Sequence, residues 1–269
     1  SDYWETLEVK KDDPKVGLGV PTGFYDLDNL LGGLHNDDLI IVAGRPGTGK
    51  TSWLLSVAMN AARMGARVAV HSMEMSAQQL VQRLVSIDTG IASQELQRGA
   101  ISDEQWARFV ESVDRLSRLA IWFDDSASLS PQQLRTKTKR LHREVGLDLV
   151  LVDGLWLMND GGGAGRNAND TARLTYMSRA AKELARELRR PVVMAHQLSR
   201  KVEDRQDKRP QLSDLRSSGS IEQDADLVCF LYRDEMYNDA TEHPGECEVI
   251  VAKHRNGPTG TITLLFQKE

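Results

Sequence analysis

Short, almost uninterrupted apolar segments alternate with amphipathic segments along most of this chain. The apolar runs occupy residues 38–44, 66–74, 120–125, 148–154 and 191–197. Runs of this length are typical of strands that are buried on both faces of a sheet. Ser102 and Gln105 form a capping box ahead of one helical segment, and Ser130 with Pro131 opens another. This alternation predicts an α/β domain with a mainly parallel central sheet flanked by helices.

The pattern changes after Asp226, where strands alone are predicted. They cover residues 226–234, 246–255 and 261–266. The last two are separated by a short turn that contains Asn, Gly and Pro, so we expect a C-terminal β-hairpin.

Three segments fit neither pattern. Residues 1–16 are charged with few apolar anchors, and we expect a short arm there, with one globular domain over residues 17–269. Residues 159–170 are rich in glycine. Residues 199–220 carry six basic and four acidic side chains and exceed the roughly 15 residues beyond which loops in compact domains are uncommon and often functional.

A phosphate-binding loop is predicted at residues 44–51, which read GRPGTGKT and fit the pattern G-x-x-x-x-G-K-[ST]. The loop follows a predicted strand and opens a helix, so its backbone N–H groups can cradle phosphate oxygens at a helix N-terminus. We expect Lys50 to reach the β- and γ-phosphates of ATP and the Thr51 hydroxyl to hold Mg²⁺. The predicted nucleotide-binding residues are Gly44, Arg45, Pro46, Gly47, Thr48, Gly49, Lys50, Thr51 and Ser52. The alternative is a glycine-rich turn with a surface lysine.

Three polar side chains are expected beside this loop, at the carboxyl ends of neighbouring strands, where open α/β sheets bind their ligands. Asp153 is the expected second Mg²⁺ ligand, and the alternative is a turn or cap residue. Glu74 is the expected base that polarises the attacking water; it could instead only interact with a helix dipole. Gln197 is expected to contact the γ-phosphate or the water, and a buried amide is its alternative.

Four further stretches resemble the C-terminal motor domain of the DnaB family of replicative helicases. They are GVPTGFYDLDNLLGGL, SMEMSAQQLVQRL, LSDLRSSGSIEQDADLVCFLYRDEMY and VAKHRNGPTG, and the similarity runs from about Gly19 to Phe266. The resemblance implies a RecA-like P-loop NTPase fold and a homo-hexameric ring with ATP sites between subunits. It also implies an ATP hydrolase of the DNA helicase type, which moves along single-stranded DNA and unwinds the duplex during DNA replication.

The resemblance also assigns roles to residues. Lys50, Thr51 and Asp153 match the family's Mg-ATP residues, Glu74 its water-activating glutamate, and Gln197 its γ-phosphate sensor. Lys253 and Arg255 match a pair that reaches into the adjacent subunit's site. Because they are two apart on a predicted strand, they should share a face; the alternative is a solvated hairpin tip. The DNA-binding set matched to the family is Arg216, Ser217, Ser218 and Gly219.

The chain departs from the family in a few places. Gly154, Leu155 and Trp156 follow Asp153 where most relatives have Tyr-Leu-Gln, and Ser217 replaces a glutamate that is common in the DNA loop. Residues 1–16 match the linker region, whose helix packs on the next subunit in the family; a disordered leader is the alternative. No segment matches the N-terminal domain on which primase docks, and the first residue is Ser1, which suggests a piece of a longer protein.

Composition limits the partners and the compartment. The net charge is −5, so DNA should be held by a few local contacts, which closure of a ring would multiply. No apolar run approaches the roughly 20 residues of a membrane span, and no membrane partner is expected. Cys229 and Cys247 suggest buried thiols in a reducing, cytoplasmic setting. A helicase loader and primase are expected as partners only through regions outside this sequence.

Competing functions remain at this point. The main alternative is a RecA-like, ATP-regulated DNA-binding ring or filament protein without processive unwinding; a small-molecule kinase has little support. Trp53, Trp106 and Trp122 are expected in the core, and His71 and His196 are expected to be packing residues.

Overall fold

A computed structural model describes residues 19–165 and 169–267, with the backbone alone for residues 216–220. The linker arm predicted at residues 1–16 lies outside the described residues. Within them, no helix is long and apolar enough to cross a membrane.

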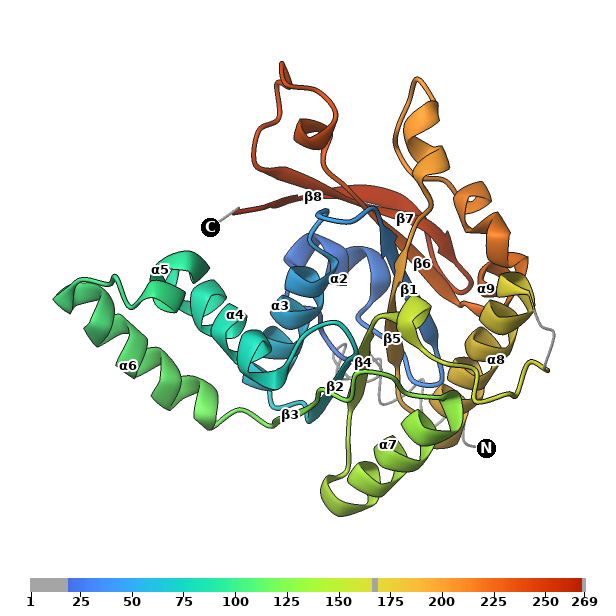
Figure 1. The fold of residues 1–269 in the computed structure, drawn as a ribbon, viewed down its shortest axis with the longest axis horizontal. Helices are drawn as coiled ribbons and strands as arrows, with labels where there is room; N and C mark the ends of the chain where they lie inside the picture. The colour runs from blue at the N-terminus through green and yellow to red at the C-terminus, as the bar shows by residue number, and fades with distance from the viewer. Residues whose placement is uncertain (1–18, 166–168, 268–269) are drawn as a thin grey trace, which may run out of the picture.

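A single sheet of eight strands runs through the described part of the chain, in the order β3-β2-β4-β5-β1-β6-β7-β8 (Figure 1). The strands are β1 (Leu39–Gly44), β2 (Val68–Ser72), β3 (Ile121–Asp124), β4 (Leu149–Asp153), β5 (Val192–Gln197), β6 (Leu227–Tyr232), β7 (Glu246–His254) and β8 (Gly260–Leu265). Strands β1 to β6 pair in parallel, whereas β7 and β8 are antiparallel. The mainly parallel sheet and the C-terminal hairpin are therefore confirmed.

Helices connect and cover these strands. They are α2 (Tyr25–Leu31), α3 (Lys50–Arg63), α4 (Ala77–Thr89), α5 (Ser93–Arg98), α6 (Asp103–Ser117), α7 (Pro131–Val145), α8 (Asp170–Leu188) and α9 (Gly219–Asp224). The capping boxes begun by Ser102 and Ser130 are both present. The segment predicted as a long loop at residues 199–220 instead contains the short 3-10 helices η2 (Arg200–Asp204) and η3 (Leu212–Ser218) and the start of α9. Short helices of this kind lack the long apolar periodicity that reveals a helix in sequence.

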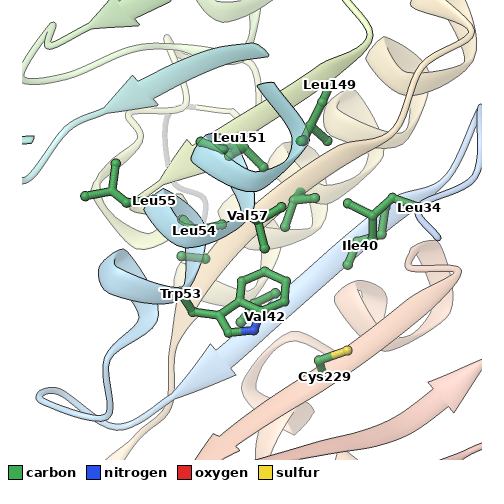
Figure 2. Packing of buried hydrophobic residues seen from close by; sticks show 14 of the residues in the cluster. Leu34, Ile40, Val42, Trp53, Leu54, Leu55, Val57, Leu149, Leu151 and Cys229 are labelled. Carbon is green, nitrogen blue, oxygen red and sulfur yellow. The ribbon is translucent and has the colours of Figure 1, made fainter. Parts of the chain in front are cut away.

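The sheet separates two apolar cores, because alternate side chains of each buried strand point to opposite faces. Ile40 and Val42 of β1 pack with Trp53 of α3 on one face, which Figure 2 shows from close by. Leu39 and Ile41 join the core on the other face, with residues of α7 and α8. The two layers position the carboxyl ends of the parallel strands along one side of the molecule.

The prediction that Trp106 lies in the core is wrong. Its side chain is 56% exposed on α6, and its ring stacks on Phe109 with 5.3 Å between ring centroids. Figure 1 shows α6 at the periphery of the molecule, beside α4 and away from the sheet, so only one side of this helix is covered. Trp122, on edge strand β3, is only half-buried, whereas Trp53 is buried as expected.

The predicted packing residues are buried. His71 contacts the carboxylate of Asp124 and the hydroxyl of Thr138. His196 is buried in β5, and burial lowers its pKa to about 4, so this side chain is neutral near pH 7. Cys229 and Cys247 are buried free thiols, and burial raises their pKa to about 12 and about 11.

Candidate nucleotide-binding site

The predicted phosphate loop connects the end of β1 to the first residue of α3. Gly47 and Gly49 have φ values of 80° and 99°, a backbone conformation that favours glycine. Gly44 is required because there is no room for a side chain: a Cβ there would lie 2.6 Å from Oγ1 of Thr48. That hydroxyl donates a hydrogen bond to the carbonyl of Arg45 at 2.8 Å, which closes the turn. The loop therefore leads into the N-terminus of α3, as a phosphate cradle requires.

Lys50 is buried inside this loop and is not the surface lysine of the alternative interpretation. Its side chain is 8% exposed, and Nζ donates to the carbonyls of Gly44 and Arg45, each at 3.0 Å. Burial lowers the pKa of Lys50 to about 8, although the nearby carboxylates of Asp153 and Glu74 oppose this shift. Carbonyl groups satisfy an ammonium less well than phosphate oxygens do, so the geometry suits release of Nζ to an incoming triphosphate.

Asp153 and Thr51 meet beside Lys50. The Thr51 hydroxyl donates to Oδ2 of Asp153 at 2.6 Å, and the carboxylate is 2% exposed. Its other oxygen, Oδ1, is buried without a hydrogen-bond partner among the described residues. Burial raises the pKa of Asp153, which the hydrogen bond from Thr51 opposes.

This donor set fits Mg²⁺. The described residues contain no cluster of three or more His, Cys, Asp or Glu side chains that could hold a metal. Mg²⁺ at phosphate sites takes only one or two protein oxygens and completes its octahedron with water and phosphate. An unpartnered carboxylate oxygen next to a hydroxyl supplies those protein ligands, and the role of both residues stays a prediction.

Glu74 and Gln197 lie at the same edge of the sheet. The strand predicted to run through Glu74 ends two residues earlier, at Ser72, so Glu74 is exposed in the loop before α4. Its charge is near enough to influence the pKa of both Lys50 and Asp153. Gln197 is the last residue of β5, pairs with Gly44 across the sheet and is half-buried. Glu74 therefore faces the site from solvent, and Gln197 borders the phosphate loop.

Lys253 and Arg255 lie far from this site in their own chain. His254, between them, pairs with Leu227, which is level with Ile40 at the start of β1. Ile40 is four residues before Gly44, or about 13 Å along a strand. The two cations are therefore at the amino-terminal edge of the central strands, and the phosphate loop is at the carboxyl edge.

The same two cations contact neighbouring residues of one segment, although Arg255 lies just beyond the end of β7. Lys253 Nζ donates to the carbonyl of Ala225 at 2.7 Å, and an Nη2 group of Arg255 donates to the carbonyl of Gln223 at 3.1 Å. Arg255 also pairs with the carboxylate of Asp226 at 3.1 Å. Both therefore contact the carboxyl end of α9, while the Arg255 side chain is 47% exposed to solvent.

The predicted DNA-binding residues lie at the junction of η3 with the same helix, α9. Arg216, Ser217 and Ser218 are the last residues of η3, and Gly219 is the first of α9. Their side chains lie outside what the structure describes, so their role stays a prediction.

Arg45 and Arg233 make side-chain contacts that the sequence analysis did not predict. The guanidinium of Arg45 turns away from the loop and donates to Glu203 and to the carbonyl of Leu198. Arg233, just after β6, donates to the carbonyl of Gly47 at 3.1 Å and lies 3.7 Å from the centroid of the Phe266 ring. A charged residue directly after a buried strand at the ligand-binding edge was the one available signal for Arg233.

The matching family profile and similar curated proteins indicate the same protein family. A family profile described as "DnaB-like helicase C terminal domain" matches residues 19–269. The "Replicative DNA helicase DnaB" of Geobacillus stearothermophilus is 47% identical over 253 residues, which is 93% of this chain and 55% of that protein. The "Replicative DNA helicase DnaC" of Bacillus subtilis (strain 168) is 46% identical over 270 residues, covering 100% of this chain and 58% of that protein. The chain thus spans little more than half the length of these curated relatives.

Solved structures agree with the sequence comparison. One of them, described as an "ATPase Domain", superposes with a TM-score of 0.94 at 36% identity, covering 100% of this chain and 95% of that one. "The Structure Of A DnaB-Like Replicative Helicase And Its Interactions With Primase" gives a TM-score of 0.89 at 38% identity, covering 93% and 62%. The RecA-like P-loop fold is therefore confirmed. The chain belongs to the DnaB-like helicase C-terminal domain family.

Proposed function

We propose that this chain is the ATP-hydrolysing motor of a hexameric replicative DNA helicase, which moves along single-stranded DNA and unwinds the duplex. The observation that carries the proposal is the buried Lys50 next to the Thr51–Asp153 pair with its unpartnered oxygen. A buried ammonium and a buried, partly unsatisfied carboxylate are costly to keep unless they serve a ligand. Membership of a helicase family makes ATP with Mg²⁺ the ligand that fits both.

Each residue has a separate task in hydrolysis. Lys50 leaves its two carbonyls and binds the phosphates. Thr51 and Asp153 would hold Mg²⁺, and the ion would neutralise charge on the phosphates. Glu74, exposed at the mouth of the site, orients the attacking water and takes its proton. Gln197, between the phosphate loop and the segment 198–220, senses loss of the γ-phosphate.

Lys253 and Arg255 act on the ATP of the adjacent subunit. Their distance from their own phosphate loop, set by the strand register, supports this assignment, because the chain cannot use them on its own nucleotide. Arginines that act in trans on phosphoryl transfer contribute about 10³–10⁵ in turnover in other systems. A ring of six subunits would provide such a neighbour at every site.

Single-stranded DNA binds at the junction of η3 and α9, through Arg216, Ser217, Ser218 and Gly219. This assignment is supported by the family membership and by the position of the junction in the unusually long connection after β5. Loader and primase would bind regions outside this chain, and the similarity to a helicase described with its interactions with primase supports that partner. We also infer a reducing, cytoplasmic setting from the two buried free thiols.

Electron microscopy with Mg-ATP and single-stranded DNA tests the assembly. Closed six-membered rings around DNA are the expected result. Open filaments would favour the second candidate, an ATP-regulated DNA-binding protein without processive unwinding, which the shared RecA-like fold also allows.

A further inference from the structure

Arg45 belongs to the phosphate loop by its backbone and to a different segment by its side chain. It is 9% exposed. Its Nε donates to Oε1 of Glu203 at 2.7 Å, and its Nη1 donates to the carbonyl of Leu198 at 2.8 Å. Leu198 directly follows Gln197, and Glu203 lies in η2. One side chain therefore ties the nucleotide site to the start of the connection that follows β5.

The backbone of Arg45 takes part in holding Lys50. Its carbonyl accepts hydrogen bonds from Lys50 Nζ at 3.0 Å and from the Thr48 hydroxyl at 2.8 Å. When Lys50 turns to a triphosphate, that carbonyl loses a charged donor. The residue whose backbone changes partners is thus the residue whose side chain holds η2.

The contacts continue from η2 towards the predicted DNA contacts. Val202 anchors η2 in the core. Arg205, directly after η2, donates to both carboxylate oxygens of Asp214, at 3.0 and 2.8 Å. Asp214 lies in η3, two residues before Arg216. Charged side-chain contacts and short helices therefore form an unbroken path from the phosphate loop to the DNA-binding junction, the kind of path that can carry coupling between two sites.

We propose that Arg45 and Glu203 form a positioning pair that couples nucleotide binding to single-stranded DNA binding. The inference rests on the proposed function and adds to it the route by which one ligand changes the affinity for the other. Arg45 suits this role better than a lysine would, because its planar group contacts a carboxylate and a carbonyl at once. Coupling of this type is reciprocal and usually amounts to a factor of about 5–150 in affinity.

The test is the ratio of the Kd values for a fluorescent oligo-dT without and with Mg-ATPγS, measured by anisotropy. For the unaltered 269-residue chain we expect a ratio of about five or more. Glu203→Ala should bring the ratio to within about twofold of one. The rate of ATP hydrolysis without DNA and the affinity for oligo-dT without nucleotide should both stay within about twofold of the values for the unaltered chain. Glu203→Gln should be intermediate, because an amide can still accept the hydrogen bond from Arg45 but carries no charge.

Glu187→Ala is the matched control. Glu187 of α8 pairs with Arg135 and Lys139 of α7, and its side chain is 30% exposed, against 38% for Glu203. This variant should keep the unaltered ratio. In the Arg45→Ala background, Glu203→Ala should cause no further loss of coupling if the two residues act as one unit.

The outcomes separate the two proposals. An unchanged ratio in Glu203→Ala, or an equal loss in Glu187→Ala, would overturn the positioning pair and leave the motor function standing. A chain that binds oligo-dT with an affinity independent of nucleotide would also overturn the coupling. A chain that binds no oligo-dT in any nucleotide state would overturn the proposed function.

Discussion

Replacing Gly49 by alanine should destabilise the domain more than the same change at any ordinary surface turn. Gly49 has a φ of 99°, and a Cβ there would lie 2.4, 3.2 and 3.3 Å from three carbons of the Phe266 ring. The ring cannot simply move away, because the guanidinium of Arg233 lies 3.7 Å from its centroid. That guanidinium is held in place by hydrogen bonds to the carbonyl of Gly47 and the carboxylate of Glu235. The substitution therefore combines backbone strain with overpacking.

Both contributions can be estimated, and Gly65 separates them. Gly65 has a φ of 92° but no atom within 4 Å of its added Cβ, so Gly65→Ala measures strain alone. Backbone strain of this kind costs about 1–3 kcal/mol. Alanine also lowers the conformational entropy of the unfolded chain, which offsets about 0.4–1 kcal/mol of that cost. Overpacking adds about 1–3 kcal/mol at Gly49. We expect Gly49→Ala to lower the free energy of unfolding by about 2–4 kcal/mol, and Gly65→Ala by about 1 kcal/mol.

Urea unfolding of both variants without nucleotide measures these values. Adding Phe266→Ala should reduce the penalty of Gly49→Ala by about the overpacking contribution, or about 1–3 kcal/mol. Equal destabilisation by Gly49→Ala and Gly65→Ala, or no rescue by Phe266→Ala, would refute the packing of Phe266 against the phosphate loop.

Other predictions concern catalysis and binding. Lys50→Ala should weaken ATP binding, whereas Glu74→Gln should bind fluorescent ATP normally and lose phosphate release; normal turnover in Glu74→Gln would remove Glu74 from the mechanism. ATP affinity at fixed Mg²⁺ should fall as pH rises through about 8, because the free protein then loses the Lys50 proton that the phosphates require; a flat titration curve from pH 7 to 9 would contradict this. Arg255→Ala should lower turnover by about 10³ or more, and mixing it with Lys50→Ala should restore some activity in rings that combine an intact loop with an intact Arg255; unaltered turnover in Arg255→Ala alone would refute the trans role. Arg216→Ala should weaken the binding of oligonucleotides of different sequence equally and flatten the salt dependence of binding. A loss of affinity for only one base sequence would contradict a phosphate contact.

The sequence predicted the sheet well because its signals are local. Apolar runs such as 148–154 and capping boxes such as Ser102 with Gln105 depend on residues within a few positions of each other. The phosphate loop and Asp153 were also predicted, since their positions follow from strand ends. The wrong position of Trp106 has a non-local cause, because exposure depends on whether another element covers α6.

Contacts between distant segments could not be predicted in the same way. Arg45 and Glu203 are 158 residues apart, and no pattern in a single sequence pairs one arginine with one glutamate among many. The position of Lys253 at the edge opposite the phosphate loop depends on the pairing of β6 with β7, which hydrophobic pattern alone does not set. The partners of both cations on α9 were missed for the same reason.

Strand displacement on a forked DNA substrate tests whether ATP hydrolysis drives this domain along single-stranded DNA. The unaltered chain should release the labelled strand with Mg-ATP, and should release none with Mg-ATPγS. Glu74→Gln should bind the fork and also release none. Hydrolysis of ATP and binding of the fork by the unaltered chain, without release of the strand at any protein concentration that forms rings, would contradict the motor function and favour the ATP-regulated DNA-binding alternative.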